Sequence, residues 1–302
     1  MTILAARGFQ ITYDTTKSSG LNLFKHGTLA YEHIFLLPLK SKGYGPNLTP
    51  NILVEYVNSG GNILLGLSGE GTTPSAIQSL LLEFDISLAP ERNAVVVDHF
   101  NYDSKSAGDK HDVLLLPGPK PVRADLEDYF AVDGTIAVPR AVGQVLGNAS
   151  PLIAPILRAP ATAYSYNPKE EEGSGLEDLF AAGNQLSLVT AFQGRNSARM
   201  TVLGSTEMLE DKWFGAQVKD ATGKDVSTAN KAFAEQVSKW TFQEIGVLKV
   251  GRVQHHLNEG KAKTSTNLSV SESPELNPEI YRIKNDVVSI TPTTHSAYST
   301  NA

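Results

Sequence analysis

The run Ala94-Val95-Val96-Val97-Asp98-His99-Phe100-Asn101-Tyr102-Asp103 is the part of the sequence from which the fold can be worked out. Its first four residues are apolar and mostly β-branched, which is typical of a short buried strand. A second apolar run, Val113-Leu114-Leu115-Leu116, follows a polar loop and is stopped by Pro117. Ligands of open α/β sheets usually bind outside the carboxyl ends of such strands. The polar and aromatic segment 98–103 therefore lies where a site is expected.

Upstream of this run, strand-like and helix-like segments alternate. Thr49-Pro50 and Thr73-Pro74 each have the cap and proline of a helix start. Between them, Asn62-Ile63-Leu64-Leu65-Gly66 predicts a buried strand. The second helix has an apolar stripe at Ile77, Leu80, Leu81 and Phe84. This order predicts an α/β fold with a mainly parallel sheet flanked by helices.

The remaining segments are assigned from their periodicity and their Pro and Gly residues. We expect a short helix over 1–7, strands at 9–13, 34–37, 186–191 and 199–204, and a helix over 229–244. Residues 118–168 are predicted to be irregular except for a strand at 163–166. We expect an α/β domain over 1–246, the start of a β-rich domain over 247–290, and a disordered tail over 291–302.

Composition excludes several classes of function. The net charge of −6 argues against a nucleic-acid surface. The chain has no cysteine, so it can form no disulfide, thiol nucleophile or cysteine-ligated metal site. No apolar run of about 18 residues is present. The first residues also lack the basic region and apolar core of a signal peptide.

The turn Gly66-Leu67-Ser68-Gly69-Glu70 allows two chemical interpretations beside a structural one. It nearly matches the G-x-S-x-G nucleophile elbow, so Ser68 and His99 could serve a hydrolase. However, Glu70 replaces the last glycine and the next helix begins late. Residues 68–71 could instead hold a sugar or lipid phosphate before a capped helix, but the lysine of a P-loop is missing. We favour a tight turn between strand and helix.

The polar segment after the strand has a structural interpretation beside a chemical one. Asp98, His99 and Asp103 could bind a metal or share a proton. However, adjacent residues of a strand point to opposite faces, and aspartates often fix turns through their own backbone. We therefore favour a structural cluster. Arg195 and Arg199 flank a predicted turn and could bind an anion, although a charged turn is the simpler interpretation.

Three sequons, at Asn47, Asn148 and Asn267, are candidate N-glycosylation sites if the chain is secretory. Thr49 is expected to cap a helix, and prolines follow the first two sequons. Asn267 is therefore the favoured acceptor.

Several segments together resemble a known family. Val97-Asp98-His99-Phe100-Asn101-Tyr102-Asp103 is similar to the signature V-x-D-H-x-N-Y-D of the 48 kDa subunit of eukaryotic oligosaccharyltransferase. Supporting matches are Gly60-Gly61-Asn62-Ile63-Leu64, Gln193-Gly194-Arg195-Asn196-Ser197-Ala198-Arg199, Gly204-Ser205, 240–248 and Val253-Gln254-His255-His256. The matches follow one another in family order, and the loops look fungal.

The resemblance implies a luminal subunit of the endoplasmic-reticulum complex that transfers a lipid-linked oligosaccharide to asparagine. It implies an amino-terminal domain like that of class I glutamine amidotransferases, flavodoxin-like, without the nucleophilic cysteine. In that family this subunit is not catalytic, needs no cofactor, and has the other oligosaccharyltransferase subunits as partners. It reaches the membrane through them and through its own carboxyl-terminal helix.

The family also begins with a signal peptide and a first strand and ends near a membrane helix. We therefore expect this chain to be truncated at both ends. The residues carried over as structural or subunit-contact positions are Asp98, His99, Asn101, Tyr102, Asp103, Arg195, Asn196 and Arg199.

Overall fold

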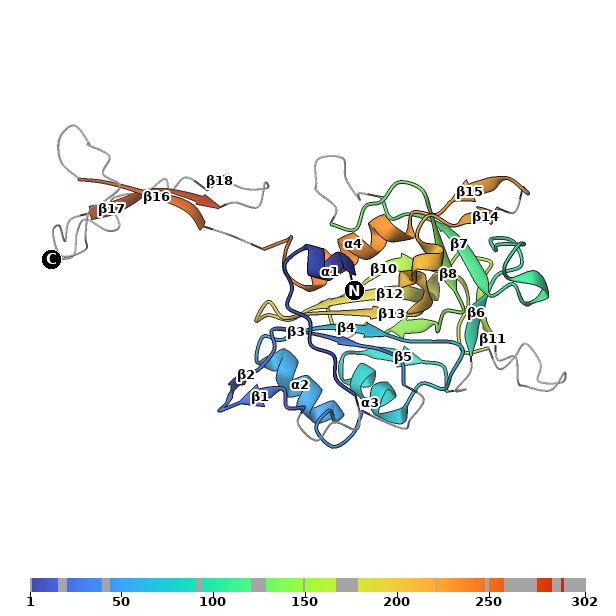
Figure 1. The fold of residues 1–302 in the computed structure, drawn as a ribbon, viewed down its shortest axis with the longest axis horizontal. Helices are drawn as coiled ribbons and strands as arrows, with labels where there is room; N and C mark the ends of the chain where they lie inside the picture. Colours follow the sequence, from blue (N-terminus) through green and yellow to red (C-terminus); the bar gives the residue numbers. More distant parts are fainter. Residues whose placement is uncertain are drawn as a thin grey trace. The chain divides into compact units, whose positions relative to one another are not determined.

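The structure is a computed structural model, and it describes most of the first 247 residues and three strands beyond them. The described ranges are 2–15, 21–39, 44–90, 94–120, 129–148, 150–166, 179–220, 222–247, 250–257, 276–283 and 289–290. Contacts divide the chain into two units, Met1–Phe242 and Gln243–Ala302, and each is considered by itself (Figure 1). The tail predicted over 291–302 lies outside the described residues.

A seven-stranded sheet forms the centre of the first unit. Its strand order is β3 (His33–Leu36), β4 (Asn62–Gly66), β13 (Arg199–Leu203), β12 (Leu186–Gln193), β9 (Gln144–Leu146) and β5 (Ile86–Leu88), with β10 (Ile153–Arg158) also paired to β12. Only the pairs β3–β4 and β4–β13 are parallel. The other four pairs are antiparallel. The sheet is therefore mixed rather than mainly parallel, and the likeness to class I glutamine amidotransferases stays a prediction.

One of the two expected crossovers does not lead to a parallel neighbour. Helix α2 (Pro50–Asn58) joins the parallel strands β3 and β4. Helix α3 (Ser75–Glu83) leads instead to β5, which runs antiparallel to β9. The valine run forms β6 (Val95–Val97), but this strand pairs with β11 (Tyr164–Tyr166) outside the central sheet.

The remaining elements of the first unit are short. The α-helices are α1 (Thr2–Ala6) and α4 (Asn230–Thr241), and the 3-10 helices are η1 (Gly108–Lys110), η3 (Gly183–Gln185), η4 (Glu207–Leu209) and η5 (Asp211–Trp213). Three antiparallel hairpins or pairs are β1 (Phe24–Lys25) with β2 (Thr28–Leu29), β7 (Val113–Pro117) with β8 (Thr135–Pro139), and β14 (Gln217–Lys219) with β15 (Asp225–Ser227). None of the helices in these described ranges is long and apolar enough to cross a membrane.

Helices cover both faces of the central sheet (Figure 1). On one face, α2 buries Leu53 and Tyr56, and α3 buries Ile77 and Leu80 of the apolar stripe that the sequence predicts. On the other face, α4 buries Phe233 and other apolar side chains. Strand β4 is buried at every position between its two parallel neighbours. Its central location explains the uninterrupted apolar sequence.

The helix caps follow the sequence in part. The Thr49 hydroxyl accepts a hydrogen bond from the Ile52 backbone N–H, as expected of a cap. Helix α3 begins after Pro74, and no side chain caps it. Helix α1 is followed by Gly8 with φ +92°, the left-handed conformation that commonly ends a helix.

Three predictions about segments are wrong. Residues 9–13 form no strand; the Phe9 ring packs instead against His33 and Phe242, with centroids 5.7 and 5.6 Å away. Residues 118–168 contain β8, β9 and β10 in addition to the expected strand. The strand β10 pairs with β12, and the sequence of β10 by itself does not indicate this pairing. Helix α4 ends at Thr241 rather than at 244.

The second unit contains β16 (Val250–Leu257), β17 (Leu276–Ile283) and β18 (Ser289–Ile290), which form an antiparallel three-stranded sheet. The described residues beyond 249 are all in strands.

Replacing Leu80 by alanine tests the packing of α3. Leu80 is fully buried, so Leu80→Ala is expected to lower the free energy of unfolding by about 2–5 kcal/mol because it leaves a cavity. Leu82 lies on the same helix and is 61% exposed, so Leu82→Ala is the matched control and is expected to change it by less than about 0.5 kcal/mol. Urea unfolding followed by circular dichroism measures both, and equal effects would contradict this packing.

Candidate functional site

Asp98 fixes the beginning of the motif segment 98–103. Its side chain is fully buried at the end of β6. One carboxylate oxygen accepts from the Phe100 backbone N–H at 2.8 Å, and the other accepts from the Asn101 amide and the Thr162 hydroxyl at 3.0 and 2.8 Å. Burial by itself raises the pKa of Asp98, but these hydrogen bonds outweigh it and the pKa is lowered. Asp98 thus joins the motif to the segment that enters β11.

Asp103 fixes the other end of the same segment. It is 1% exposed, and its carboxylate accepts from the backbone N–H groups of Lys105 (3.2 Å), Ser106 (3.1 Å) and Lys219 (2.8 Å). The Ser106 hydroxyl donates to it as well. Lys219 is the last residue of β14, so this carboxylate holds the motif and the β14–β15 hairpin together.

Of the side chains between these two aspartates, His99 and Phe100 are exposed, and Asn101 and Tyr102 are half-buried. Phe100 is 64% exposed, and His99 is exposed with its Nε2 atom 2.9 Å from the Tyr164 hydroxyl. The Tyr102 ring lies against the His111 ring, with centroids 4.2 Å apart. The Asn101 amide donates to the Asp98 carboxylate, as described above. Asp98 and His99 point apart, as the alternation of a strand predicts.

The second motif, around residues 194–199, serves the central sheet. Asn196 donates to the backbone carbonyls of Val57 and Asn58 at 2.7 and 3.0 Å, at the end of α2. Arg199 is 2% exposed, donates to the Trp240 carbonyl at 2.7 Å, and lies over the Trp240 ring at 4.7 Å. Burial lowers the pKa of Arg199. Arg195 is exposed. The structure therefore does not bring Arg195 and Arg199 together as an anion site.

The glycine-rich turn after β4 is closed by its own contacts. The Gly69 N–H donates to the Arg140 carbonyl at 3.1 Å, and the Glu70 N–H donates to the Ser68 hydroxyl at 3.2 Å. A phosphate cradle needs such N–H groups for its ligand. In the described part of the chain no hydrogen bond joins Ser68 to His99; the Ser68 hydroxyl accepts from Glu70, and His99 Nε2 lies beside the Tyr164 hydroxyl. The hydrolase hypothesis lacks the pairing that it requires.

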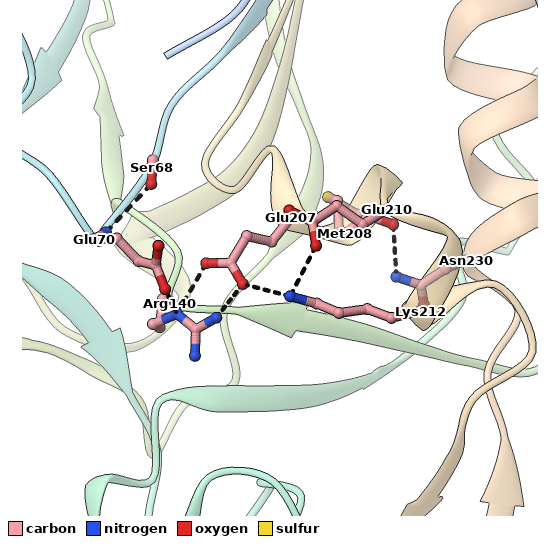
Figure 2. Close-up of polar contacts among 8 residues, drawn as sticks. All are labelled: Ser68, Glu70, Arg140, Glu207, Met208, Glu210, Lys212 and Asn230. Carbon is pink, nitrogen blue, oxygen red and sulfur yellow. Dashed lines mark hydrogen bonds and ion pairs between the residues drawn. The ribbon is translucent and has the colours of Figure 1, made fainter. Parts of the chain in front are cut away.

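A row of charged side chains covers the carboxyl ends of β4, β8 and β13. Figure 2 shows Arg140 between Glu70 and Glu207, with Lys212 beyond Glu207. The Arg140 Nε atom is 2.8 Å from Glu207 and 3.3 Å from Glu70, and a second guanidinium nitrogen also contacts Glu207. Lys212 lies 3.4 Å from Glu207 and 2.8 Å from Glu210. These charges neutralise one another at the edge where ligands of α/β sheets usually bind.

Arg140 stays charged in this network. Burial lowers the pKa of Arg140, but the hydrogen bonds with Glu207 and the charges of Glu207, Glu70 and Asp112 raise it further than burial lowers it. The pKa of Lys212 is raised chiefly by its hydrogen bond with Glu210. Arg140 has φ +44°, and its backbone N–H donates to the Asp112 carbonyl at 2.7 Å. Contacts of both its side chain and its backbone therefore hold Arg140 in this conformation.

Arg140 and Glu207 are not among the residues predicted from the sequence, although a signal for Arg140 is present. Thr135-Ile136-Ala137-Val138-Pro139 is the same kind of apolar run, ended by proline, as the run before Pro117. Reading 135–139 as a strand would have placed Arg140 at a strand end. Glu207 follows the predicted strand at 199–204 after a short connection, and no local pattern distinguishes it.

The sequons differ in accessibility. The Asn47 amide donates to the Leu21 carbonyl at 2.8 Å, and Thr49 is used as a helix cap. Asn148 is exposed. Asn267 lies outside the described residues. Among the residues that the structure describes, no group of three His, Cys, Asp or Glu side chains could hold a metal ion.

The first unit is thus an α/β domain on a mixed sheet, with a surface motif held by buried carboxylates. The family "OST48, N-terminal domain" matches residues 1–244, and the chain belongs to this family. The 48 kDa subunits of the dolichyl-diphosphooligosaccharide–protein glycosyltransferase of Danio rerio and Drosophila melanogaster are 32% and 33% identical over 84% of this chain. The wbp1 subunit of Schizosaccharomyces pombe is 33% identical over 94% of it.

The matched region is only part of these relatives. It covers 56% of the Danio rerio and Drosophila melanogaster proteins and 59% of the Schizosaccharomyces pombe protein. Among solved structures, a protein described as the mmIFT52 N-terminal domain aligns with 66% of this chain and 72% of its own, at a TM-score of 0.42 and 16% identity. That similarity is too low to support an argument about the fold.

Substitutions at two glycines test the turn after β4. A Cβ atom at Gly69 would lie 2.4 Å from the Arg140 carbonyl oxygen and from Val95, whereas one at Gly71 would meet nothing within 4 Å. Gly69→Ala is expected to lower stability by about 1–3 kcal/mol through overpacking. Gly71→Ala is the control and is expected to stay within about 0.5 kcal/mol. Thermal unfolding measures both, and an unchanged Gly69→Ala variant would contradict the close packing.

Asp98→Asn tests the buried carboxylate. We expect a loss of about 1–3 kcal/mol at pH 7, because Asn101 and Thr162 lose a charged acceptor. A lowered pKa in the folded state stabilises the protein above the ordinary aspartate pKa, and this contribution is lost as the pH falls through the folded value. The difference from the unsubstituted protein should therefore shrink below about pH 4.

Urea unfolding between pH 7 and pH 3 measures this difference. The control is Asp109→Asn, because Asp109 is exposed. A difference that stays constant over this range would show that the charge of Asp98 does not stabilise the fold.

Proposed function

We propose that this chain is the amino-terminal part of a non-catalytic oligosaccharyltransferase subunit, on the luminal side of the endoplasmic reticulum membrane. Its role is to assemble and stabilise the complex that transfers a lipid-linked oligosaccharide to asparagine. The observation that carries the proposal is the family match over residues 1–244, together with relatives named as subunits of that glycosyltransferase.

The geometry supports a structural rather than a catalytic role. The buried carboxylates of Asp98 and Asp103 are used to hold turns, and Arg199 is used to join β13 to α4. Ser68 bonds within its own turn. The charges at the carboxyl edge of the sheet are paired with one another. The Gly69 and Glu70 N–H groups and the charged side chains at this edge therefore already have structural partners.

The test is assembly in cells. The chain, fused to the part of the Schizosaccharomyces pombe relative that follows the matched region, is tagged and expressed in cells depleted of wbp1. Detergent extracts are then purified through the tag. We expect the other subunits to be purified with the tagged protein in stoichiometric amounts. We also expect the occupancy of sequons on a reporter glycoprotein to be restored. Recovery of the tagged protein alone, with a complete complex formed without it, would overturn the proposal.

Ser68→Ala separates assembly from catalysis in the same cells. We expect unchanged occupancy per assembled complex, because the Ser68 hydroxyl only accepts a hydrogen bond within its turn. A complex that assembles in full but glycosylates at least tenfold more slowly would instead support the hydrolase-like use of Ser68.

A further inference from the structure

A hollow of about 320 Å³ lies between the motif and the β14–β15 hairpin, away from the charged row described above. It is lined by His99, Phe100, Tyr102, Ser104, Asp220 and Gly223. Its volume falls at the lower end of the range, about 300–1,000 Å³, that is typical of small-ligand sites. We infer that this hollow binds a neutral sugar ring, and this inference rests on the proposed function because it assigns a ligand to that subunit.

The two walls of the hollow are held in place before any ligand arrives. The Asp103 carboxylate accepts from Ser106 on the motif side and from Lys219 on the hairpin side. The Lys105 ammonium group also donates to the Gln217 carbonyl at 3.5 Å. A site whose walls are already fixed loses little conformational entropy when it binds.

The motif wall is aromatic, and its rings continue beyond the hollow. The centroid of His99 is 4.4 Å from that of His111 and 5.9 Å from that of Tyr164. Phe100 is 64% exposed, although its backbone N–H is fixed by Asp98. The exposed Phe100 ring therefore offers an apolar face beside the hollow on which a ligand can stack. The C–H face of a pyranose is an apolar surface of matching shape.

The hairpin wall supplies the polar group. One carboxylate oxygen of Asp220 accepts from the Thr222 N–H and hydroxyl and from the Lys224 N–H, at 2.9, 2.6 and 3.0 Å. The hydrogen bond with Thr222 is the main cause that lowers the pKa of Asp220. In the described part of the chain, the other carboxylate oxygen accepts no hydrogen bond. It is thus able to accept from sugar hydroxyl groups, as is the Ser104 hydroxyl.

Three other ligand classes fit less well. Among the described residues that line the hollow there is no lysine or arginine, which disfavours a phosphate. The three rings come from one segment and form one wall, whereas a cage for a quaternary ammonium ion surrounds its ligand. Six residues are few beside the roughly 20–30 residues on each side of a stable protein interface.

Ligand-observed NMR on the 302-residue chain tests the inference. The probes are methyl α-mannoside, methyl β-glucoside and N,N′-diacetylchitobiose, each at millimolar concentration, with sorbitol, tetramethylammonium and inorganic phosphate as comparisons. We expect saturation transfer to the ring C–H protons of at least one sugar and none to sorbitol, which has hydroxyl groups but no ring face. Binding of tetramethylammonium or phosphate without binding of any sugar would overturn the inference, as would no binding at all.

Substitutions at Phe100 assign that signal to the hollow. Phe100→Ala is expected to raise the dissociation constant for the sugar at least fivefold. Phe100→Trp, which keeps an aromatic face, is expected to change it less than twofold. Leu82→Ala removes an equally exposed apolar side chain elsewhere and is expected to leave it unchanged. Melting temperatures establish that each variant is folded. Equal affinity in Phe100→Ala and the unsubstituted chain would overturn the inference.

The same variant separates this inference from the proposed function. In the tagged fusion protein, Phe100→Ala is expected to leave recovery of the other subunits unchanged while sugar affinity falls. Loss of the subunits with sugar affinity intact would show that Phe100 contacts a partner protein, and it would overturn the sugar site but not the proposed function. Failure of the unsubstituted fusion to recover any subunit would count only against the proposed function.

Discussion

The surface formed by the motif segment 98–103 depends on the hydrogen bonds that the buried carboxylate of Asp103 accepts. A buried charge is strongly unfavourable unless hydrogen bonds compensate it. Asp103 is 1% exposed and accepts bonds from two segments more than a hundred residues apart, the loop at Lys105–Ser106 and the end of β14 at Lys219. The carboxylate and the pairing of these segments therefore require each other. If the hairpin moved away, the charge would lose its shortest backbone partner.

Asp98 applies the same principle five residues earlier, and the two together explain the composition of the motif. Each carboxylate faces inward and binds backbone N–H groups or neighbouring polar side chains. Between them, His99 and Phe100 are exposed, whereas Tyr102 is half-buried against a small core cluster. In the sequence these acidic residues look like catalytic groups. In the structure they hold the backbone of the motif in place through hydrogen bonds.

Local patterns were sufficient for elements whose residues interact with near neighbours. The strands at 62–66, 95–97 and 113–117 and the apolar face of α3 are confirmed because local side-chain patterns encode them. The direction of strand pairing is not encoded in this way. Strand β10 at 153–158 finds its partner at 186–193, so no property of 118–168 revealed it. The structural interpretation of Asp98 followed from turn chemistry, whereas the contact of Asp103 with Lys219 needed the fold.

The carboxyl edge of the sheet shows why the site of this domain need not lie where α/β folds usually place it. There the Gly69 N–H is bonded to Arg140, and Arg140 is bonded in turn to Glu207. A ligand at that edge would have to replace several charge-assisted contacts, and each is stronger than an ordinary hydrogen bond. A ligand in the hollow beside Phe100 would replace no such contacts, because the Phe100 ring and one oxygen of Asp220 already face solvent. Ligand binding is therefore more favourable beside the motif than at the edge that the fold class suggests.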